Sequence, residues 1–328
     1  MNVSVVCTVL NEEKTIAPLL DSLLTQTIAP KEIIIVDGGS KDHTQAIIRS
    51  YQEKNDHIYL VVKKGNVAVG RNTAIAEAEY PIIAQIDGGC IAKADWLEKL
   101  TAPFENKETQ VVAGFYEITC NSALSCAVAP FTGTTKRRYD QRSFMPSARS
   151  MAMRRSVWEA VGGYSEALGR AAEDTLFNYH LLLHHIEIVR VPEAIVYWEA
   201  PRSLGAMYRK FYQYAKSDVQ TGIWWHPARR FSTHNIKVLT IFARYFVFGM
   251  TFSLSLWYPM FSSIALTIFG LYLLWSLVKL REDVEDFGAL ILVPVVQVFS
   301  DVTVMAGFIA GLLQLGDTPS ENHEHKVQ

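Results

Sequence analysis

Two stretches, EIIIVDGGS at residues 32–40 and IIAQIDGG at residues 82–89, decide the fold of this chain. Each is a short apolar run, rich in β-branched residues, that ends in an aspartate and two glycines. Such runs are typical of strands buried on both faces of a parallel sheet. Because ligands of these sheets bind beyond the carboxyl ends of the strands, Asp37 and Asp87 are expected to line one crevice. The alternative for each is ordinary turn chemistry, which also favours Asp-Gly.

The flanking sequence alternates between strand and helix patterns. Asn11 is the predicted N-cap of a helix that extends to Leu24. Further strands are expected at residues 3–10, 58–62, 111–119 and 150–154, and further helices at residues 43–54 and 68–79. The alternation predicts an α/β fold with a Rossmann-like, mostly parallel sheet, which we place at residues 1–200.

The composition argues against several classes of protein. The 328 residues include 31 Lys+Arg and 33 Asp+Glu, for a net charge of -2, so a nucleic-acid-binding protein is not expected. The four cysteines have no C-x-x-C pair and no metal-ligand spacing, which argues against a disulfide-built secreted domain and a zinc module. Neither strand is followed by G-x-G-x-x-G or a P-loop, so a dinucleotide dehydrogenase and a P-loop NTPase are disfavoured.

Charged residues at two further positions are candidates for the same crevice. Arg71 opens the helix at residues 68–79, where a cation opposes the helix dipole unless an anion or a carboxylate is near. This position fits a bound phosphate, and it also fits a solvated surface arginine. Glu173 and Asp174 fall in the first turn of another helix, where acids are favoured for dipole reasons alone. The functional interpretation is a carboxylate that takes a proton from an attacking hydroxyl.

Six motifs, in this order, resemble family-2 glycosyltransferases of the GT-A fold. The resemblance extends from residue 3 to about residue 220. The motifs are SVVCTVLNEEKTIAPLLDSLLTQT, EIIIVDGGSKDHT, GRNTAIAEA, IIAQIDGGCIAKADWLEKL, VGGYSE and AEDTLFNYHLLL. Each motif alone is weak, but six in family order over two-thirds of the chain are specific.

The resemblance implies how a nucleotide sugar would be held. Asp37 matches the acid that contacts the base or ribose of the nucleotide, and Arg71 matches an arginine near its phosphates. Asp87, followed by Gly88, matches the first acid of a D-x-D element. In the family, that element holds a divalent cation on the diphosphate, so the resemblance implies Mg²⁺ or Mn²⁺ as a cofactor with Asp87 as its ligand.

The resemblance also implies the reaction. Asp174 matches the catalytic base, with Glu173 beside it. Both acids favour a hydroxyl acceptor, since an already ionised phosphate acceptor needs no base. The implied activity is inverting transfer of a sugar from a nucleotide sugar, with UDP as the default nucleotide, to a lipid-linked or membrane-proximal glycan. Two alternatives stay open, a polyprenyl-phosphate sugar synthase and a catalytically inactive membrane scaffold.

The chain departs from the family pattern at the cation site. Gly89 replaces the second acid of the D-x-D element, and Trp198 stands near the position where a histidine often serves as a further metal ligand. The resemblance therefore implies a weaker cation site, with Arg202, Arg209 or Lys210 partly neutralising the diphosphate.

The C-terminal part of the sequence is predicted to cross a membrane. Residues 238–278 contain one charged side chain, Arg244, and residues 287–315 contain one, Asp301. Because about 20 residues span the hydrocarbon core, three transmembrane helices are expected. Their predicted positions are residues 238–258, 260–278 and 287–313. Arg244 leaves an interfacial position open for the first helix, and Asp301 should face another helix or be protonated.

Basic residues set the predicted orientation. Arg229, Arg230 and Lys237 precede the first span, and Lys279 and Arg281 follow the second. The positive-inside rule then places the catalytic domain in the cytosol and the C-terminus outside. The sequence thus predicts a multi-pass protein of the cell membrane. Its expected partners are the bilayer, a nucleotide sugar and a glycan acceptor, with homo-oligomers through the transmembrane helices as a further expectation.

Two segments flank the predicted spans. Residues 201–235 are rich in aromatic and basic side chains and are predicted to form amphipathic interfacial helices. Residues 316–328 are polar and are predicted to be a flexible tail.

Overall fold

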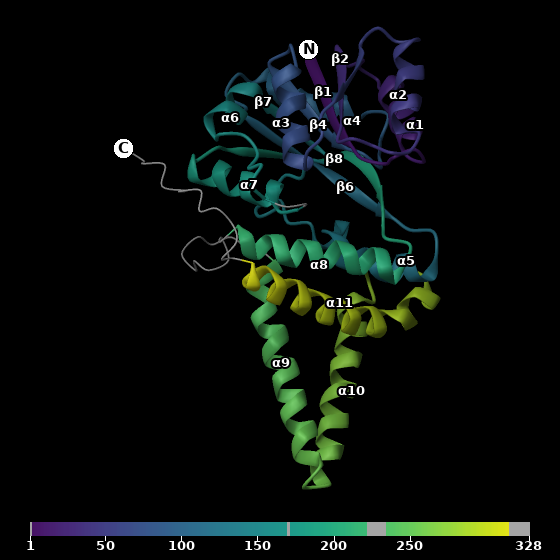
Figure 1. Cartoon of the computed structure of the whole chain (residues 1–328), viewed down its shortest axis with the longest axis vertical. Helices are drawn as coiled ribbons and strands as arrows, with labels where there is room; N and C mark the ends of the chain where they lie inside the picture. The colour runs from purple at the N-terminus through teal and green to yellow at the C-terminus, as the bar shows by residue number, and fades with distance from the viewer. Residues whose placement is uncertain (1, 169–170, 222–233, 315–328) are drawn as a thin grey trace.

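The computed structural model describes residues 2–168, 171–221 and 234–314, and within them the chain forms one eight-stranded sheet (Figure 1). The strand order is β3-β2-β1-β4-β7-β6-β8-β5. The strands are β1 (Val3–Val9), β2 (Glu32–Asp37), β3 (Ile58–Val62), β4 (Ile82–Asp87), β5 (Cys90–Ala92), β6 (Val111–Thr119), β7 (Met151–Arg154) and β8 (Ile188–Glu199).

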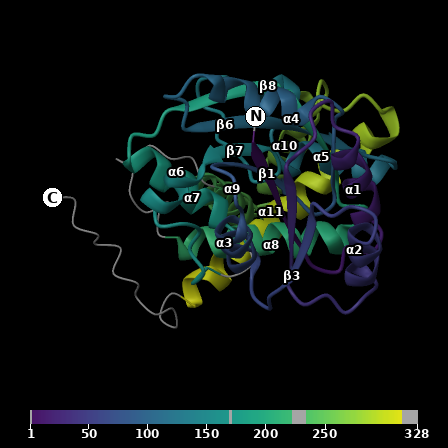
Figure 2. The same cartoon turned by 90° about the horizontal axis from the view of Figure 1, so that it is seen from above.

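The sheet is mostly parallel, as predicted. Strands β1 to β4 run parallel to one another, and β6 runs parallel to β8. Only β7, between β4 and β6, and β5, at the edge beside β8, are antiparallel to their neighbours in the described residues. The side chains of β1 and β2 are almost all buried because helices cover both faces. Seen from above, α3 (Val67–Glu77) lies on one face, and α1 (Ile16–Leu24) and α2 (Thr44–Gln52) lie on the other (Figure 2).

The start of α1 differs from the prediction. The helix begins at Ile16, so Asn11 is not its N-cap. Asn11 instead has φ 58° and joins two loops: its N–H donates to Ser40 Oγ (2.8 Å), and its side-chain oxygen accepts from the Lys41 N–H (2.9 Å). An asparagine tolerates this left-handed conformation better than most residues. The loop after β1 is thereby fixed against the loop after β2.

The remaining helices of the N-terminal part close the sheet and connect it to the C-terminal part. They are α4 (Trp96–Thr101), α5 (Ala123–Thr132), α6 (Arg155–Ala160), α7 (Glu173–Leu183) and two short 3₁₀ turns, Ala102–Glu105 and Lys136–Arg138. A disulfide that the sequence did not predict joins Cys120 to Cys126 where the chain passes from β6 into α5.

A layer of helices lies below the carboxyl ends of the parallel strands (Figure 1). Helix α8 (Leu204–Gln220) lies between the sheet and α11 (Phe287–Leu313). The two helices touch backbone to backbone: a Cβ at Gly307 would lie 2.4 Å from the Tyr212 carbonyl oxygen, and a Cβ at Gly311 would lie 2.8 Å from that of Lys216. The glycines of α11 therefore permit an approach that larger side chains would prevent.

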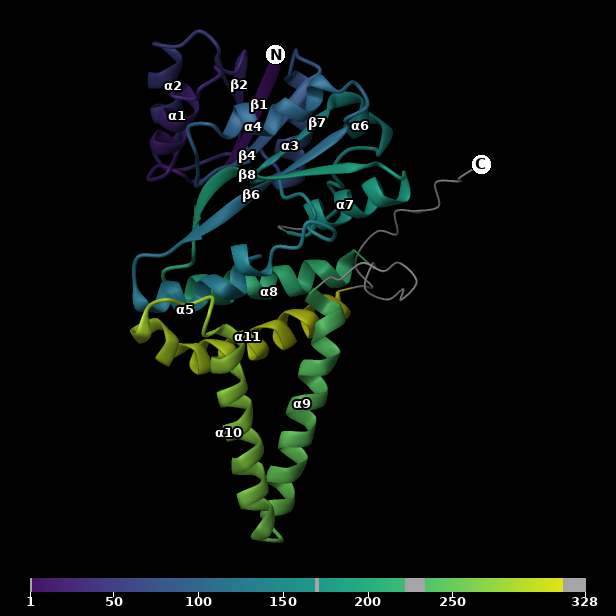
Figure 3. The same ribbon diagram turned by 180° about the vertical axis from the view of Figure 1, so that it is seen from behind.

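Helices α9 (His234–Ser255) and α10 (Met260–Leu280) form a hairpin that projects away from the sheet (Figure 3). The hairpin turn carries Trp257 and Tyr258, whose side chains are exposed. With about 1.5 Å of rise per residue, each helix is about 30 Å long, which matches the hydrocarbon core of a bilayer.

Three helices long and apolar enough to cross a membrane are present in the described residues, as predicted, at Lys237–Ser255, Met260–Leu280 and Phe287–Leu313. The three helices do not form one bundle, however, because only α9 and α10 run alongside each other as a hairpin. Helix α11 runs across the base of the α9–α10 hairpin, alongside α8 (Figures 1 and 3). One face of α11 packs on α8 and α5. The other presents a stripe of exposed apolar side chains: Phe287, Ile291, Val295, Val302, Ile309 and Leu313.

The two charges of the apolar helices meet where these helices cross. Arg244 Nη1 donates to Asp301 Oδ2 at 2.9 Å, and Gln297 Nε2 donates to Asp301 Oδ1 at 2.9 Å. The Tyr272 hydroxyl also donates to this carboxylate, which is 3% exposed. The prediction that Asp301 faces another helix is confirmed.

The whole of one predicted segment and part of another lie outside the described residues. These are residues 316–328 of the predicted tail and residues 222–233 of the predicted interfacial segment at residues 201–235. Helix α8 is the principal described part of that segment.

Candidate active site

Strand β1 brings the two predicted aspartates to the same edge of the sheet. In its two ladders, Val9 pairs with Asp37 of β2, and Thr8 pairs with Asp87 of β4. The carboxylates therefore end neighbouring strands on either side of β1, as the sequence predicted. Their environments differ, and each is described in turn.

Asp37 is completely buried. Its Oδ1 accepts the backbone N–H groups of Gly39 (2.8 Å) and Ser40 (2.7 Å) and the side-chain amide of Gln45 (2.8 Å). Its Oδ2 is also buried and has no hydrogen-bond partner within the described residues. Leaving a buried polar atom without a partner costs about 1–3 kcal/mol. This oxygen is therefore available to accept a hydrogen bond from a ligand hydroxyl or N–H.

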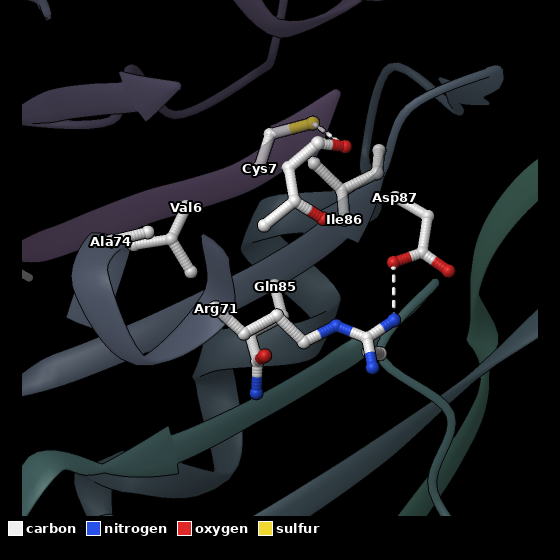
Figure 4. Close-up of a pocket in the computed structure, with 9 residues that line it drawn as sticks. Val6, Cys7, Arg71, Ala74, Gln85, Ile86 and Asp87 are labelled. Carbon is white, nitrogen blue, oxygen red and sulfur yellow. Dashed lines mark hydrogen bonds and ion pairs between the residues drawn. The ribbon is translucent and has the colours of Figure 1, made fainter. Parts of the chain in front are cut away.

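Arg71 is not a surface residue, so that alternative is wrong. Its side chain is 6% exposed and bridges two acids: Nη2 lies 2.8 Å from Asp87 Oδ1, and Nη1 lies 2.5 Å from Glu173 Oε1. The guanidinium also lies over the ring of Tyr164, 5.3 Å from its centre. Figure 4 shows Arg71 reaching from α3 to the Asp87 carboxylate beside β4. A cation thus occupies the place beside Asp87 where a phosphate or metal ion could otherwise be expected.

Burial and charge oppose each other in this cluster. Burial disfavours the charged form of Arg71, but Asp87 and Glu173 outweigh it and raise the pKa of the guanidinium. Burial would raise the pKa of Asp87, but the charges of Arg71 and Arg149 hold it below its ordinary value. Burial raises the pKa of Glu173 to about 7, against the effect of Arg71. Asp87 is therefore the carboxylate most firmly kept ionised among these three groups.

Adjacent acids in the first turn of α7 face different surroundings. Glu173 is 6% exposed and bound to Arg71, whereas Asp174 is half-buried and forms no ion pair within the part of the chain that the structure describes. Asp174 is still close enough to act electrostatically on Arg71 and on Arg149. The turn begins after Ala172, whose φ of 70° is unusual for a residue with a side chain. Asp174 is thus the more exposed acid of this pair.

The turn after Asp87 packs tightly against the end of β1. The Gly88 N–H donates to the Thr8 carbonyl oxygen (3.3 Å), and a Cβ at Gly88 would lie 3.1 Å from the same oxygen. Gly89 has φ +78°, and a Cβ there would lie 3.6 Å from Glu12 Oε2. Glu12 is therefore a second acid near this turn, which sequence reasoning missed. Burial raises the pKa of Glu12 above its ordinary value.

These residues do not assemble a site for the predicted metal. Within the described ranges, no group of three His, Cys, Asp or Glu side chains could hold a metal ion. Asp87 accepts from Arg71, and the raised pKa of Glu12 disfavours the ionised form that a metal requires. Trp198, which stands near the expected histidine, offers no lone pair. Mg²⁺ is commonly bound through one or two carboxylates together with substrate phosphates, and Asp87 is already paired with Arg71, so the protein side chains alone offer the ion a weak site.

The predicted basic residues of α8 and its approach are placed differently from expectation. Arg202 is exposed and pairs with Glu199 through two hydrogen bonds of 2.6 and 2.7 Å. Arg209 is exposed on α8. Lys210, on the next position of the helix, instead turns toward the sheet: its Nζ lies 3.4 Å from the centre of the Trp198 ring.

Arg149 is a site residue that sequence reasoning missed. Its guanidinium lies 4.0 Å from the centre of the same Trp198 ring and 5.2 Å from that of Tyr116. The available signal was its place in a basic run at residues 136–155, but nothing in that run distinguishes Arg149 from its neighbours. Only the fold brings Arg149 to Trp198, near the end of β8.

The sheet and its helices define an α/β domain of the GT-A fold, with two aspartates at one edge of the sheet and a buried arginine between two acids. Residues 4–162 match the family model described as "Glycosyl transferase family 2". Residues 4–162 of the chain therefore form a family-2 glycosyltransferase domain, as predicted, and four of the six motifs lie within these residues.

Curated relatives agree with this assignment. Glycosyltransferase AglE of Haloferax volcanii is 31% identical over 46% of this chain and 48% of its own length. The uncharacterized glycosyltransferase EpsJ of Bacillus subtilis is 26% identical over 62% of this chain and 62% of its own length. The chain thus matches about half to three-fifths of the length of these relatives.

Among solved structures, the mannosyltransferase PcManGT of Pyrobaculum calidifontis, in complex with GDP-Man and Mn²⁺, has a similar fold. The TM-score is 0.56 at 17% sequence identity, over 96% of this chain and 86% of that chain. At this identity the likeness shows the fold alone. The mannose, the guanine nucleotide and the Mn²⁺ are properties of that protein.

Proposed function

We propose that this protein is a membrane-anchored, inverting glycosyltransferase that moves a sugar from a nucleotide sugar, with UDP as the default nucleotide, to a hydroxyl group of a lipid-linked or membrane-proximal glycan. The observation that carries the proposal is that the two acids in the first turn of α7 have different surroundings. Glu173 is bound to Arg71, whereas Asp174 is half-buried without an ion pair in the described residues. A free carboxylate beside a nucleotide site is what a hydroxyl acceptor requires.

The chemistry follows from the placement of these groups. The acceptor oxygen attacks the anomeric carbon, a new C–O bond forms, and the bond between that carbon and the diphosphate breaks. Asp174 takes the hydroxyl proton, and the nucleoside diphosphate leaves with the bonding electrons. Because attack and departure occur on opposite faces, the anomeric configuration inverts. Asp37 Oδ2 accepts a hydrogen bond from the nucleoside, and Arg71 keeps Asp87 in place beside the diphosphate.

The position of the site supports a membrane-proximal acceptor. The carboxyl ends of the parallel strands face α8, and α8 rests on α11 and the base of the α9–α10 hairpin (Figure 1). Lys210 of α8 contacts Trp198 of β8, so the candidate site residues near the end of β8 lie directly against this helical layer. An acceptor held by a lipid would therefore reach the site over a short distance.

For the membrane topology, we propose two crossings rather than the three predicted from sequence. The α9–α10 hairpin has the length of a bilayer core, and its turn carries Trp257 and Tyr258, which suit the far interface. Helix α11 crosses its base with an exposed apolar stripe, as expected for a helix lying in the interface. Both chain ends would then lie on one side, in the cytosol by the positive-inside rule.

The disulfide between Cys120 and Cys126 bears on this orientation. Disulfides are rare in the reducing cytosol, so this bond argues against the cytosolic orientation that the basic residues favour. The labelling experiment described in the Discussion does this.

The proposed reaction is tested with the full-length protein in lipid nanodiscs. A panel of UDP- and GDP-linked sugars is supplied together with a lipid extract, and both sugar incorporation into lipid and release of nucleoside diphosphate are measured. We expect transfer from one donor, with a product linked through a glycosidic bond rather than a sugar phosphate. A sugar phosphate product would identify a polyprenyl-phosphate sugar synthase instead. Absence of donor binding across the panel would identify an inactive scaffold.

A further inference from the structure

The residue opposite the Asp87 turn is an indole rather than a metal ligand. In the antiparallel ladder between β5 and β8, Cys90 pairs with Trp198. Cys90 follows Asp87 by three residues, so the pairing fixes Trp198 beside the turn that begins at Asp87. The strand register thus preserves the position at which a cation ligand is expected, but the side chain there cannot bind a cation through a lone pair.

Two basic side chains from separate elements lie on this indole. Arg149, from the loop before β7, lies 4.0 Å from the ring centre, and Lys210, from α8, lies 3.4 Å from it. Arg149 also donates to Ser147 Oγ (2.9 Å) and to the Tyr214 hydroxyl (3.3 Å). All of these partners are neutral. Within the described residues, neither Arg149 nor Lys210 forms an ion pair with a carboxylate.

Two half-buried cations at one ring repel each other and lose hydration. Burial and, to a smaller extent, the charge of Arg149 together lower the pKa of Lys210 to about 7. A cation–π contact contributes about 0.5–2 kcal/mol to each charge but neutralises neither. An arrangement of this kind is unfavourable in the free protein and becomes favourable when an anion with more than one negative charge is bound.

The two cations also interact with the acids that the proposed reaction uses. Arg149 and Lys210 both act on the charge of Asp87, and Asp174 acts on the charge of Arg149. In the proposed reaction the sugar lies between the base and the diphosphate, so a diphosphate near Asp87 and Arg149 would be compatible with Asp174 as the base.

We propose that Arg149 and Lys210, held over Trp198, form the diphosphate subsite of the donor and supply the charge neutralisation that a protein-bound divalent cation supplies in a metal-dependent enzyme of this fold. The inference rests on the proposed use of a nucleotide sugar. It assigns diphosphate binding to residues from β8, α8 and the loop before β7, instead of to a cation held at Asp87.

The experiment measures binding rather than turnover. Full-length protein is treated with EDTA, and the affinities for UDP, GDP and inorganic pyrophosphate are measured by calorimetry in EDTA and again with Mn²⁺. Lys210→Met removes the ammonium, Lys210→Arg restores a cation, and Lys216→Met removes a lysine elsewhere on the same helix as the control. Because Lys210→Met also relieves repulsion with Arg149, it is expected to fold at least as stably as the natural sequence.

We expect the natural protein to bind UDP or GDP in EDTA, with an affinity within about threefold of that in Mn²⁺. Lys210→Met should weaken binding in EDTA by about tenfold or more, the loss of one charge-assisted contact of about 1.4 kcal/mol. Lys210→Arg should retain most of the affinity, and Lys216→Met should retain all of it.

Binding that disappears in EDTA and returns with Mn²⁺ would overturn the inference and leave the proposed function standing. Equal effects of Lys210→Met and Lys216→Met would overturn it as well, because the effect would then not depend on the subsite. Failure of all three probes to bind in either condition would overturn both the inference and the proposed function.

Discussion

Cys90 and Trp198 are partners in the β5–β8 ladder, and this pairing determines what stands beside Asp87. A single substitution can therefore restore the ligand that the family pattern expects. In Trp198→His, an imidazole replaces the indole at an unchanged register position, and the stacking surface for the two cations is lost. We expect nucleoside diphosphate binding to weaken in EDTA and to gain a response to Mn²⁺, since imidazole suits first-row transition metals.

The matched control for this substitution is Trp198→Phe, which keeps an aromatic ring and offers no ligand. It should show no gain in Mn²⁺ response. Calorimetry with and without Mn²⁺ measures both variants. An equal Mn²⁺ response in the histidine and phenylalanine variants would contradict the expectation.

Asp174→Asn tests the general base. The side chain is half-buried and forms no ion pair in the described residues, so its removal should leave folding and donor affinity unchanged. A positioned base contributes about 10²–10⁴-fold in rate, and we expect turnover at saturating acceptor to fall by about 10² or more. Product formation is measured with donor affinity determined separately. Near-normal turnover would indicate an acceptor that is already ionised.

Glu173→Gln should mainly lower the stability of the folded protein, whereas Asp174→Asn should mainly lower the turnover rate. The substitution removes the charge that faces Arg71 in a buried pair, while Asp87 remains as a partner. We expect a loss of about 1–3 kcal/mol in the free energy of unfolding, the cost of weakening a buried charged hydrogen bond. Thermal unfolding without ligand measures it. If the variant were fully stable but catalytically dead, the roles of the two acids would be exchanged.

The lowered pKa of Lys210 predicts that pH has opposite effects on the stability of the protein and on diphosphate binding. Burial lowers its pKa to about 7 in the folded protein, from about 10.4 in the unfolded chain. Between these values the unfolded chain holds a proton that the folded protein lacks, so this group raises stability as pH rises. Diphosphate binding needs the ammonium, so UDP or GDP affinity should fall over the same range.

The measurement compares unfolding and UDP binding between about pH 6 and about pH 9. Other charged groups near this lysine are Arg149, Asp87 and Cys90, and burial raises the pKa of Cys90 to about 12, so that this thiol stays neutral. Lys210→Met should flatten both pH profiles. A binding profile that keeps its slope in this variant would assign the titration to another group.

Cysteine labelling tests the two-crossing topology. Single cysteines are placed at Tyr258 in the hairpin turn, at Glu282 between α10 and α11, and at Gln314 after α11. With two crossings, the reagent should reach positions 282 and 314 from one side and position 258 from the other. Labelling of 282 and 314 from opposite sides would mean that α11 crosses the bilayer. The side on which 282 lies also gives the orientation of the catalytic domain.

The sequence was informative where local pattern and position agree. Apolar runs ending in Asp37 and Asp87 predicted two strands of one parallel sheet, and the structure has both strands in that sheet, one on each side of β1. The burial of Arg71 was not predictable, because its two carboxylate partners come from distant parts of the chain. From the sequence, Arg202 and Lys210 were equally plausible as residues that neutralise the diphosphate. In the structure, Lys210 points toward Trp198, whereas Arg202 is exposed and pairs with Glu199.

The same limit explains the membrane prediction. Length and hydropathy identify α11 as a candidate span, but they do not report what its faces contact. Gly307 and Gly311 allow it to lie against α8, and this contact is a tertiary one. A helix buried on one side by protein and on the other by lipid has the same composition as one that crosses the bilayer.

Helix α8 belongs to both halves of the molecule. One side places Lys210 against Trp198 of β8, and the other side, with Met207 and Phe211, packs into the cluster that includes α11. A water-soluble enzyme therefore cannot be obtained by truncation. Truncation before α8 removes the Lys210 ammonium. Truncation after α8 exposes to water the apolar side chains that pack on α11. Because α8 packs on α11 on one side and contacts Trp198 on the other, we expect the rate of the proposed reaction to depend on the lipids that surround α11.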